Sequence, residues 1–193
     1  MEISMDVIKA LRDRTSVSVM QCKKALEEAG GDIDKAEVIL KKRSSEAAEK
    51  KADRSLGAGT IGTYVHEGAI GSMVLLSCET DFVAKNPDFS ALARDLAMHV
   101  AAADPKYTAS EEIPEDAKAA AMAVFEKEME RKPEDMKAKI MEGKIGSYFS
   151  DQVFLEQPFI KEESKKIKDL LNEASQKFGE RVEVSRFVRM SAR

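Results

Sequence analysis

The chain has 193 residues, of which 34% are charged and 43% are apolar, and its net charge is −4. This composition is typical of a soluble globular protein, and the acidic balance argues against nucleic acid as a partner because nucleic-acid-binding surfaces carry a basic excess. No apolar run approaches the roughly 18 residues of a membrane span, and the N-terminus lacks the apolar region of a signal peptide, so we expect a cytoplasmic protein without a membrane partner.

The first fifty residues predict three short helices. The first covers residues 4–14, and the second begins after Ser18, which forms the pattern of a capping box with Gln21. The glycine pair at 30–31 ends the second helix, and Asp32 caps the third. Three helices of this length joined by tight turns form a small bundle with little core of its own.

The segment 44–55, SSEAAEKKADRS, is polar with charges on all sides. This pattern is typical of a solvated helix or a flexible linker and not of a packed face. We therefore expect a domain boundary near residue 55, with an N-terminal module at 1–55 and a core domain at 56–193.

The hydrophobic period changes after the boundary, from helical spacing to alternation. The runs GTIGTYVHEG at 59–68 and AIGSMVLLSC at 69–78 predict two strands joined at Glu67–Gly68 in a hairpin. Pro87 is suited to the first turn of the next helix, which carries an apolar stripe and extends to about residue 104.

The last third of the chain predicts further helices and one strand. Residues 110–150 are helical in pattern with a break at Pro133, and 164–178 form a helix that Gly179 ends. The segment 181–190 predicts a strand, with these apolar side chains on one face: Val182, Val184, Val188 and Met190. The predicted fold class is α+β, a three-helix module followed by a small antiparallel sheet packed with helices.

Few residues are candidates for catalysis. Cys78 and His66 are the obvious nucleophile and base, but the hairpin register places them at opposite ends of the ladder, about 20 Å apart. The other cysteine, Cys22, lies in no metal-binding or disulfide pattern, and His99 lies within an apolar helix as a satisfied, partly buried histidine. We expect no catalytic residue, no metal site and no cofactor.

The glycine string GAGTIG at 57–62 has the spacing of a dinucleotide fingerprint. Such a fingerprint follows a strand and opens a helix, whereas this string follows a polar linker and opens a strand. These glycines are therefore interpreted as residues of the strand entry.

The segment ETDFV at 79–83 follows the second strand of the hairpin. Thr80 is suited to cap a short helix, and Asp81 in the first turn is favourable for the helix dipole. Phe82 has two interpretations, a core residue of that helix or an exposed aromatic finger, and the local pattern favours the core.

Two long segments carry a resemblance to a known family. IKALRDRTSVSVMQCKKALEEAGGDIDKAEVIL and GTIGTYVHEGAIGSMVLLSCETDFVAKNPDF occur in this order, and they are similar to the N-terminal module and the core signature of the bacterial translation elongation factor Ts family. The resemblance extends over nearly the whole chain. It implies a ubiquitin-associated-like fold for the N-terminal module.

The resemblance also implies a function. Family members promote nucleotide exchange on elongation factor Tu without enzymatic chemistry, and Thr80, Asp81, Phe82 and Val83 match their magnesium-dislocation motif. In the family the Asp-Phe pair enters the G domain near the magnesium and phosphate site, which weakens GDP binding. Phe82 is then a finger and not a core residue.

Further contacts follow from the same resemblance. His66 matches a histidine that assists at the G-domain contact. The N-terminal module of the family contacts another G-domain helix, and the aligned positions are Lys9, Arg12, Val19 and Met20. From the residues alone, these four are equally explained as solvated charges and bundle core.

The sequence departs from the family pattern in the turn before the second helix. The family has a glycine-rich Thr-Gly-Ala-Gly-Met there, followed by Asp-Cys-Lys-Lys. This chain has Ser16, Val17 and Ser18 in the turn and Gln21 in place of the Asp. Ser and Val resist the positive φ that glycine permits, so we expect a turn of different shape, compensated by the Ser18 cap.

The chain has one copy of the core that long family members carry twice. Short members are reported to pair, so the resemblance implies a homodimer through the sheet region. Two alternatives remain beside nucleotide exchange: an adaptor that binds peptides or nascent chains through the N-terminal module, and an enzyme that uses Cys78 or acidic groups.

Overall fold

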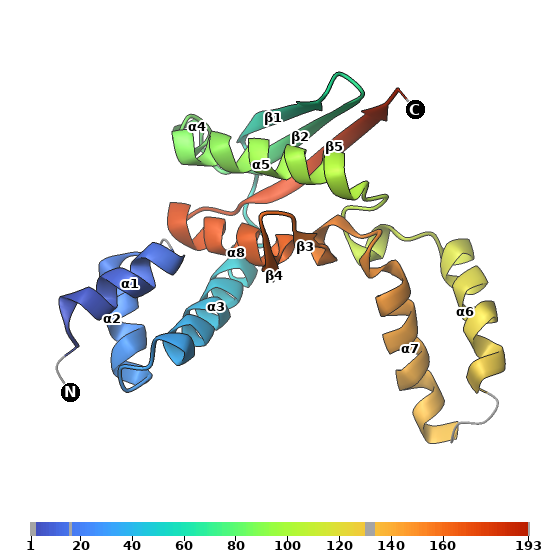
Figure 1. Cartoon of the computed structure of the whole chain (residues 1–193), viewed down its shortest axis with the longest axis horizontal. Coiled ribbons are helices and arrows are strands. Elements are labelled where there is room, and N and C mark those ends of the chain that lie inside the picture. The colour runs from blue at the N-terminus through green and yellow to red at the C-terminus, as the bar shows by residue number, and fades with distance from the viewer. Residues whose placement is uncertain (1–2, 16, 130–133, 193) are drawn as a thin grey trace.

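A computed structural model describes residues 3–15, 17–129 and 134–192. Figure 1 shows the three-stranded sheet and helix α5 at the top and two helical legs that diverge below them. One leg is the N-terminal module, formed by α1 (Met5–Thr15), α2 (Val19–Glu28) and α3 (Ile33–Glu49). The other leg is the pair α6 (Glu115–Met129) and α7 (Glu134–Ser150). The mixed fold class expected from the sequence is confirmed.

The N-terminal module forms as its capping pattern predicts. The Ser18 hydroxyl accepts from the Gln21 backbone N–H at 3.4 Å, and an Asp32 carboxylate oxygen accepts from the Lys35 N–H at 3.0 Å. The three helices enclose a small core of their own: Ile8, Leu11, Val17, Cys22, Ala25, Leu26, Ala36 and Leu40.

The segment 44–55 differs from the expectation of a fully solvated stretch. Helix α3 continues to Glu49 and packs against α8 (Ile167–Phe178). Ser44 is buried at this contact and bonds to Gln176. The prediction failed because serines, which are small, allow two helices to approach closely although they add nothing to an apolar stripe.

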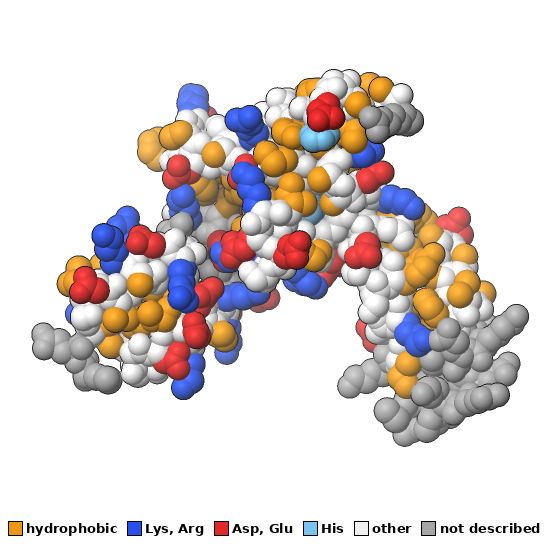
Figure 2. Space-filling view, in the orientation of Figure 1, with side chains coloured by type: hydrophobic (Ala, Val, Ile, Leu, Met, Phe, Trp, Pro, Cys, Tyr) orange, Lys and Arg blue, Asp and Glu red, His pale blue; other side chains and the backbone are white. Residues whose placement is uncertain are grey.

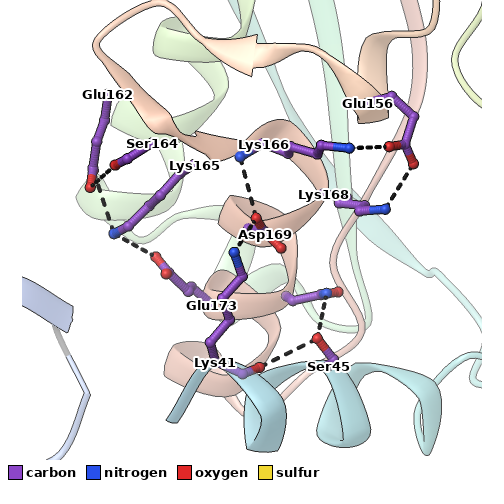
Figure 3. A network of polar contacts seen from close by, with 11 residues as sticks. Lys41, Ser45, Glu156, Glu162, Ser164, Lys165, Lys166, Lys168, Asp169 and Glu173 are labelled. Carbon is purple, nitrogen blue, oxygen red and sulfur yellow. Dashed lines mark hydrogen bonds and ion pairs between the residues drawn. The ribbon is translucent and has the colours of Figure 1, made fainter. Parts of the chain in front are cut away.

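Polar contacts hold the junction of α3 and α8 (Figure 3). The Lys41 ammonium lies 2.7 Å from the buried Asp169 carboxylate, and the Asn172 amide donates to the Ser45 hydroxyl at 3.3 Å. Because Asp169 is 8% exposed, its ion pair with Lys41 is screened less than a surface pair. The N-terminal module is thereby attached to the rest of the chain. The division at residue 55 stays a prediction.

The sheet has the strand order β1-β2-β5 and is antiparallel, with β1 at Ala58–His66, β2 at Ile70–Cys78 and β5 at Glu183–Ser191. Helix α5 (Pro87–Ala103) covers one face of it (Figure 1). A Cβ on Gly62 would overlap the carbonyl of Ala93 on α5, so helix and strand meet backbone to backbone. This contact explains why a glycine lies in the middle of β1.

The expected alternation of β5 is wrong in its second half. Val182 and Val184 are buried as predicted, but Val188 and Met190 are exposed, at 44% and 73%. The register shifts between the partners of Leu75 and Leu76, because Leu75 pairs with Arg186 and Leu76 with Val184. The extra residue, Ser185, is a β-bulge that reverses the facing of every later side chain.

Helices and a short ladder complete the chain. The expected break at Pro133 lies outside the described residues, between the end of α6 at Met129 and the start of α7 at Glu134. The predicted helix from residue 164 begins three residues later, because Glu162–Lys166 form strand β4 against β3 (Pro158–Phe159). Within the described residues, no helix is both long and apolar enough to cross a membrane.

His99 of α5 lies inside the main core and is fully buried, more than the sequence pattern predicts. Its Nε2 lies 2.9 Å from Gln157 Oε1, and its Nδ1 accepts from the Ile160 backbone N–H at 3.4 Å. Burial lowers the pKa of the His99 imidazole, against the smaller raising effect of the Gln157 hydrogen bond. His99 is therefore a satisfied structural histidine.

Candidate functional site

A four-residue helix, α4 (Asp81–Ala84), leaves the end of β2 and forms the tip of the candidate site. Thr80 caps it, because the Thr80 hydroxyl accepts from the Val83 backbone N–H at 3.5 Å. Asn86 then caps α5 with Pro87 in its first turn. The polar caps at Thr80 and Asn86 limit α4 to a single helical turn, which packs against β1 and β2.

The four residues of α4 divide into two pairs. Val83 and Ala84 are buried in the main core, whereas Asp81 and Phe82 point outward. Phe82 is 82% exposed, the largest value among the large apolar side chains of the described residues. The local pattern favoured a core position for Phe82, and that interpretation is wrong because one helical turn buries only its inner side. An apolar projection stands at this end of the molecule in Figure 2.

Asp81 carries a local ion pair at the surface. Its carboxylate lies 2.7 Å from the Lys85 ammonium one turn later, and both side chains are 77% exposed. The Lys85 hydrogen bond and charge lower the pKa of the Asp81 carboxyl. Exposed pairs of this kind contribute little to stability, so Asp81 can exchange Lys85 for another partner at small cost.

The start of the tip is held from behind by the segment that follows α8. A Glu180 carboxylate oxygen accepts from the backbone N–H groups of Glu79 and Thr80, each at 3.0 Å, and its other oxygen accepts from the Thr80 hydroxyl at 2.5 Å. In return, the Glu79 carboxylate accepts from the Arg181 backbone N–H at 2.6 Å. No local sequence pattern predicts this contact, because about 100 residues separate its two sides.

The charge of Glu79 is stabilised at the same place. The Arg181 N–H, followed by the Arg54 guanidinium at 3.1 Å, holds the pKa of the Glu79 carboxyl below its ordinary value. The Arg181 guanidinium in turn donates to the Arg54 carbonyl at 2.7 Å. The tip is therefore connected to the end of the polar segment that follows α3.

His66 lies far from the α4 tip. It is exposed at the turn end of β1 and pairs with Ile70, whereas Cys78 at the other end pairs with Ala58. Eight strand steps separate the two ends, roughly 26 Å. The Tyr64 hydroxyl contacts His66 Nδ1 at 3.1 Å, with the two rings stacked. His66 and Phe82 thus belong to separate surfaces.

This register also answers the question of a Cys78–His66 pair. Cys78 is buried, its thiol donates to the Thr80 carbonyl at 3.2 Å, and burial together with the Glu180 charge raises its pKa. A buried, protonated thiol remote from His66 is not an activated nucleophile. In the described part of the chain, no group of three or more His, Cys, Asp or Glu residues is arranged to hold a metal ion.

The four N-terminal candidates are exposed residues of α1 and α2. Lys9, Arg12, Val19 and Met20 are all exposed, with Met20 at 65% and Val19 at 39%. Their interpretation as bundle core is therefore wrong, and solvated side chains or a contact surface remain. We call this set the outer face of the N-terminal module.

The altered turn beside the outer face forms without strain at its described positions. Ser16 lies outside the described residues, Val17 is buried in the module core, and Ser18 has φ of −60°. The positive φ angles of non-glycine residues in the described ranges belong to Glu67 and Asp104. Val17 is thus an apolar anchor of the turn in the module core.

The open face of the sheet, opposite α5, is apolar. Ile61 pairs with Leu75 across β1 and β2, and Met73 pairs with Val188 across β2 and β5. We use the name open face for the exposed apolar residues of the three strands: Ile61, Val65, Met73, Leu75, Val188 and Met190. Because of the bulge at Ser185, the last two side chains lie on this face.

Comparison with known proteins places the chain in one family. The sequence model of the family described as Elongation factor TS matches residues 20–193. The chain is 45% identical over 190 residues to elongation factor Ts of Thermodesulfovibrio yellowstonii and 46% identical over 190 residues to that of Thermotoga petrophila. Each alignment covers 98% of this chain and 96% of the relative.

Elongation factor Ts of Myxococcus xanthus is 44% identical over 195 residues, with 97% of this chain and 88% of the relative covered. Identity at this level over nearly full length leaves no part of the described fold outside the match. The chain therefore belongs to the elongation factor Ts family of translation elongation factors.

Proposed function

We propose that this chain is a guanine nucleotide exchange factor that binds elongation factor Tu in its GDP form and promotes release of GDP so that GTP can bind. The observation that carries the proposal is the exposure of Phe82, which is held on a capped helical turn that also carries the exposed ion pair of Asp81 and Lys85. The Phe82 ring is 82% exposed, so its apolar surface stays in water in the free chain, and burial of that surface by a partner would be favourable.

The mechanism requires no acid, base or nucleophile on this chain. Phe82 and Asp81 enter the G domain of the partner between two helices and disturb the coordination of its Mg²⁺. Because Mg²⁺ is the largest local charge opposing the phosphates, its displacement removes much of the binding free energy of GDP. A factor that prefers the nucleotide-free state weakens GDP binding by the same amount that GDP weakens binding of the factor.

The outer face of the N-terminal module is proposed as a second contact with the same partner. In Figure 1 the module and α4 lie on the same side of the molecule, away from α6 and α7. We propose that one partner contacts both the module and α4. The basic and acidic side chains interspersed over the module in Figure 2 suit a protein partner better than a polyanion. His66 is proposed as a third, separate contact.

The remaining proposals concern context. We infer two functional parts, 1–55 for the outer face and 56–193 for the tip and the open face, in a cytoplasmic protein that acts by binding and not by catalysis. The ion pair between Lys41 on α3 and Asp169 on α8 is one of the contacts that join the two parts.

We further propose that two copies of the chain pair through the open face. The apolar cross-strand pairs Ile61–Leu75 and Met73–Val188 extend over three strands, and the exposed Thr63 and Arg186 lie on the same face beside them. A monomer would leave this surface in water, whereas a second identical sheet face would bury it.

The dimer is tested by Met73→Lys, because Met73 is central and 45% exposed. Light scattering across a concentration series should give twice the chain mass for the wild type and the single mass for Met73→Lys. The control is Val124→Lys, since Val124 on α6 is 67% exposed and lies outside the sheet. A wild-type mass equal to one chain at all concentrations would exclude the dimer.

Nucleotide exchange is tested by release of a fluorescent GDP analogue from bacterial elongation factor Tu. The complex is mixed rapidly with excess GDP and either no addition, the wild-type chain or Phe82→Ala, with circular dichroism to confirm folding. We expect rapid release that depends on Phe82. If the folded wild-type chain does not accelerate release, the proposal is wrong and the adaptor alternative becomes the better account.

A further inference from the structure

The contact behind the α4 tip joins two pairs of neighbouring residues that are far apart in the chain. Glu79 and Thr80 precede α4, and Glu180 and Arg181 follow α8, which ends at Gly179 with φ of 74°. Each pair offers a carboxylate to a backbone N–H of the other pair. This arrangement fixes the path of both backbones at the place where they meet.

A helix of one turn cannot sustain itself. Forming the first turn fixes several backbone dihedral angles for a single hydrogen bond, so nucleation is unfavourable. α4 has only four residues, and its inner side chains, Val83 and Ala84, anchor its end and not its start. The start must be fixed by other contacts if Phe82 is to project in one direction.

Glu180 supplies those contacts through three hydrogen bonds. Hydrogen bonds to an ionised carboxylate are shorter and stronger than neutral ones. The Thr80 hydroxyl donates to Glu180 and accepts from the Val83 N–H, so the Glu180 carboxylate is linked through Thr80 into the first turn of α4. Removal of Glu180 would leave the Glu79 and Thr80 N–H groups without this acceptor.

We propose that Glu180 is a positioning residue for the exchange reaction. It holds the start of α4 in place and so sets the direction in which Asp81 and Phe82 project. This role rests on the proposed exchange function, because positioning matters only if the tip enters a partner. Glu180 itself contacts the motif from behind and acts through Thr80.

The first test needs no partner. Amide hydrogen exchange of Glu79 and Thr80 is measured by NMR in the wild type, Glu180→Ala and Glu156→Ala. Glu156 is the matched control, because its carboxylate pairs with Lys166 and Lys168 in a separate network (Figure 3). Glu180→Ala should accelerate exchange of both amides roughly 10-fold or more, and Glu156→Ala should leave them unchanged. Unchanged amides in Glu180→Ala would overturn the proposal.

The second test separates positioning from mere stability. In the GDP-release assay, Glu180→Ala should lower the maximal release rate roughly 10-fold and change the half-saturating concentration much less, because the outer face still binds. Glu180→Gln should keep most of the rate, since an amide oxygen still accepts from two N–H groups. A Gln variant as slow as Ala would contradict the proposal.

The third test is a double-mutant cycle with Phe82→Ala. If Glu180 acts through the tip, adding Glu180→Ala to Phe82→Ala should slow release no further. Additive losses would overturn the positioning role. If the wild type itself fails to accelerate GDP release, the proposed function fails, whereas the hydrogen-exchange test still decides whether Glu180 orders the tip.

Discussion

The α4 tip and the outer face of the N-terminal module both expose apolar side chains, but their supports differ. The tip is one helical turn anchored in the main core through Val83 and fastened by Glu180. The outer face lies on helices with a separate small core and meets the main body through α3 and α8. The comparison suggests two different roles: the module provides binding surface, and the tip holds the Phe82 side chain in one orientation.

The largest difference between the two regions is expected in nucleotide exchange. Phe82→Ala should slow GDP release roughly 30-fold or more, the scale of a central hot spot, because one buried aromatic side chain is lost from the contact. Met20→Ala should slow it by less than about 5-fold, because Met20 is one of several contacts on a broad surface. Stopped-flow measurement of GDP release for both variants in parallel gives the ratio of their rates. Equal losses of rate would contradict the different roles proposed for the two regions.

The second prediction concerns stability within the tip. Val83→Ala should lower the free energy of unfolding by about 1–2 kcal/mol, because Val83 is 4% exposed in the main core. Phe82→Ala should change it by less than about 0.5 kcal/mol, as expected for a surface position. Urea denaturation followed by circular dichroism measures both values. A stability loss for Phe82→Ala as large as that for Val83→Ala would mean that the ring is buried in solution.

The smallest effect is expected from pH. Both histidines lie outside the N-terminal module, and burial holds the pKa of His99 below its unfolded value of about 6.5. A lowered histidine pKa stabilises the fold fully above that value, and this stability is lost as the pH falls below it, because the unfolded chain binds the proton more readily. The main core should therefore weaken between pH 7.5 and 5.5, whereas the module should not.

Residue-resolved hydrogen exchange at the two pH values, corrected for the intrinsic rates, measures the core and the module separately. Equal weakening of the module amides would show that another group is responsible. If His99→Gln folds, the stability of its core should depend less on pH than that of the wild type. The comparison of core and module in the wild type tests the prediction even if this variant does not fold.

Much of the fold follows from local signals in the sequence. The caps at Ser18, Asp32 and Thr80 form as their residue types predict, because capping depends on side chains within three positions. The hairpin turn at Glu67–Gly68 is likewise local, with positive φ at both residues. These features need no knowledge of distant parts of the chain.

The features that escaped prediction depend on distant contacts. The local sequence after the Thr80 cap would be the same whether or not another element packed over Phe82, so the local pattern cannot predict the exposure of Phe82. The bulge at Ser185 is set by pairing with β2, and the burial of Ser44 is set by α8. Glu180 belongs to the same class, because it meets Thr80 only after the whole core has folded.

The glycine in the middle of β1 has a mechanical consequence. Since α5 rests directly on the backbone at Gly62, little compressible side-chain material separates the helix from the hairpin. Helix α4, which carries Phe82, lies in the chain between β2 and α5 and is therefore attached directly to this rigid pair of helix and sheet. A force on Phe82 from a bound partner therefore acts on α5 and on the sheet together, so it is distributed over both elements. A more flexible attachment of α4 would deform on binding before the partner changed its conformation.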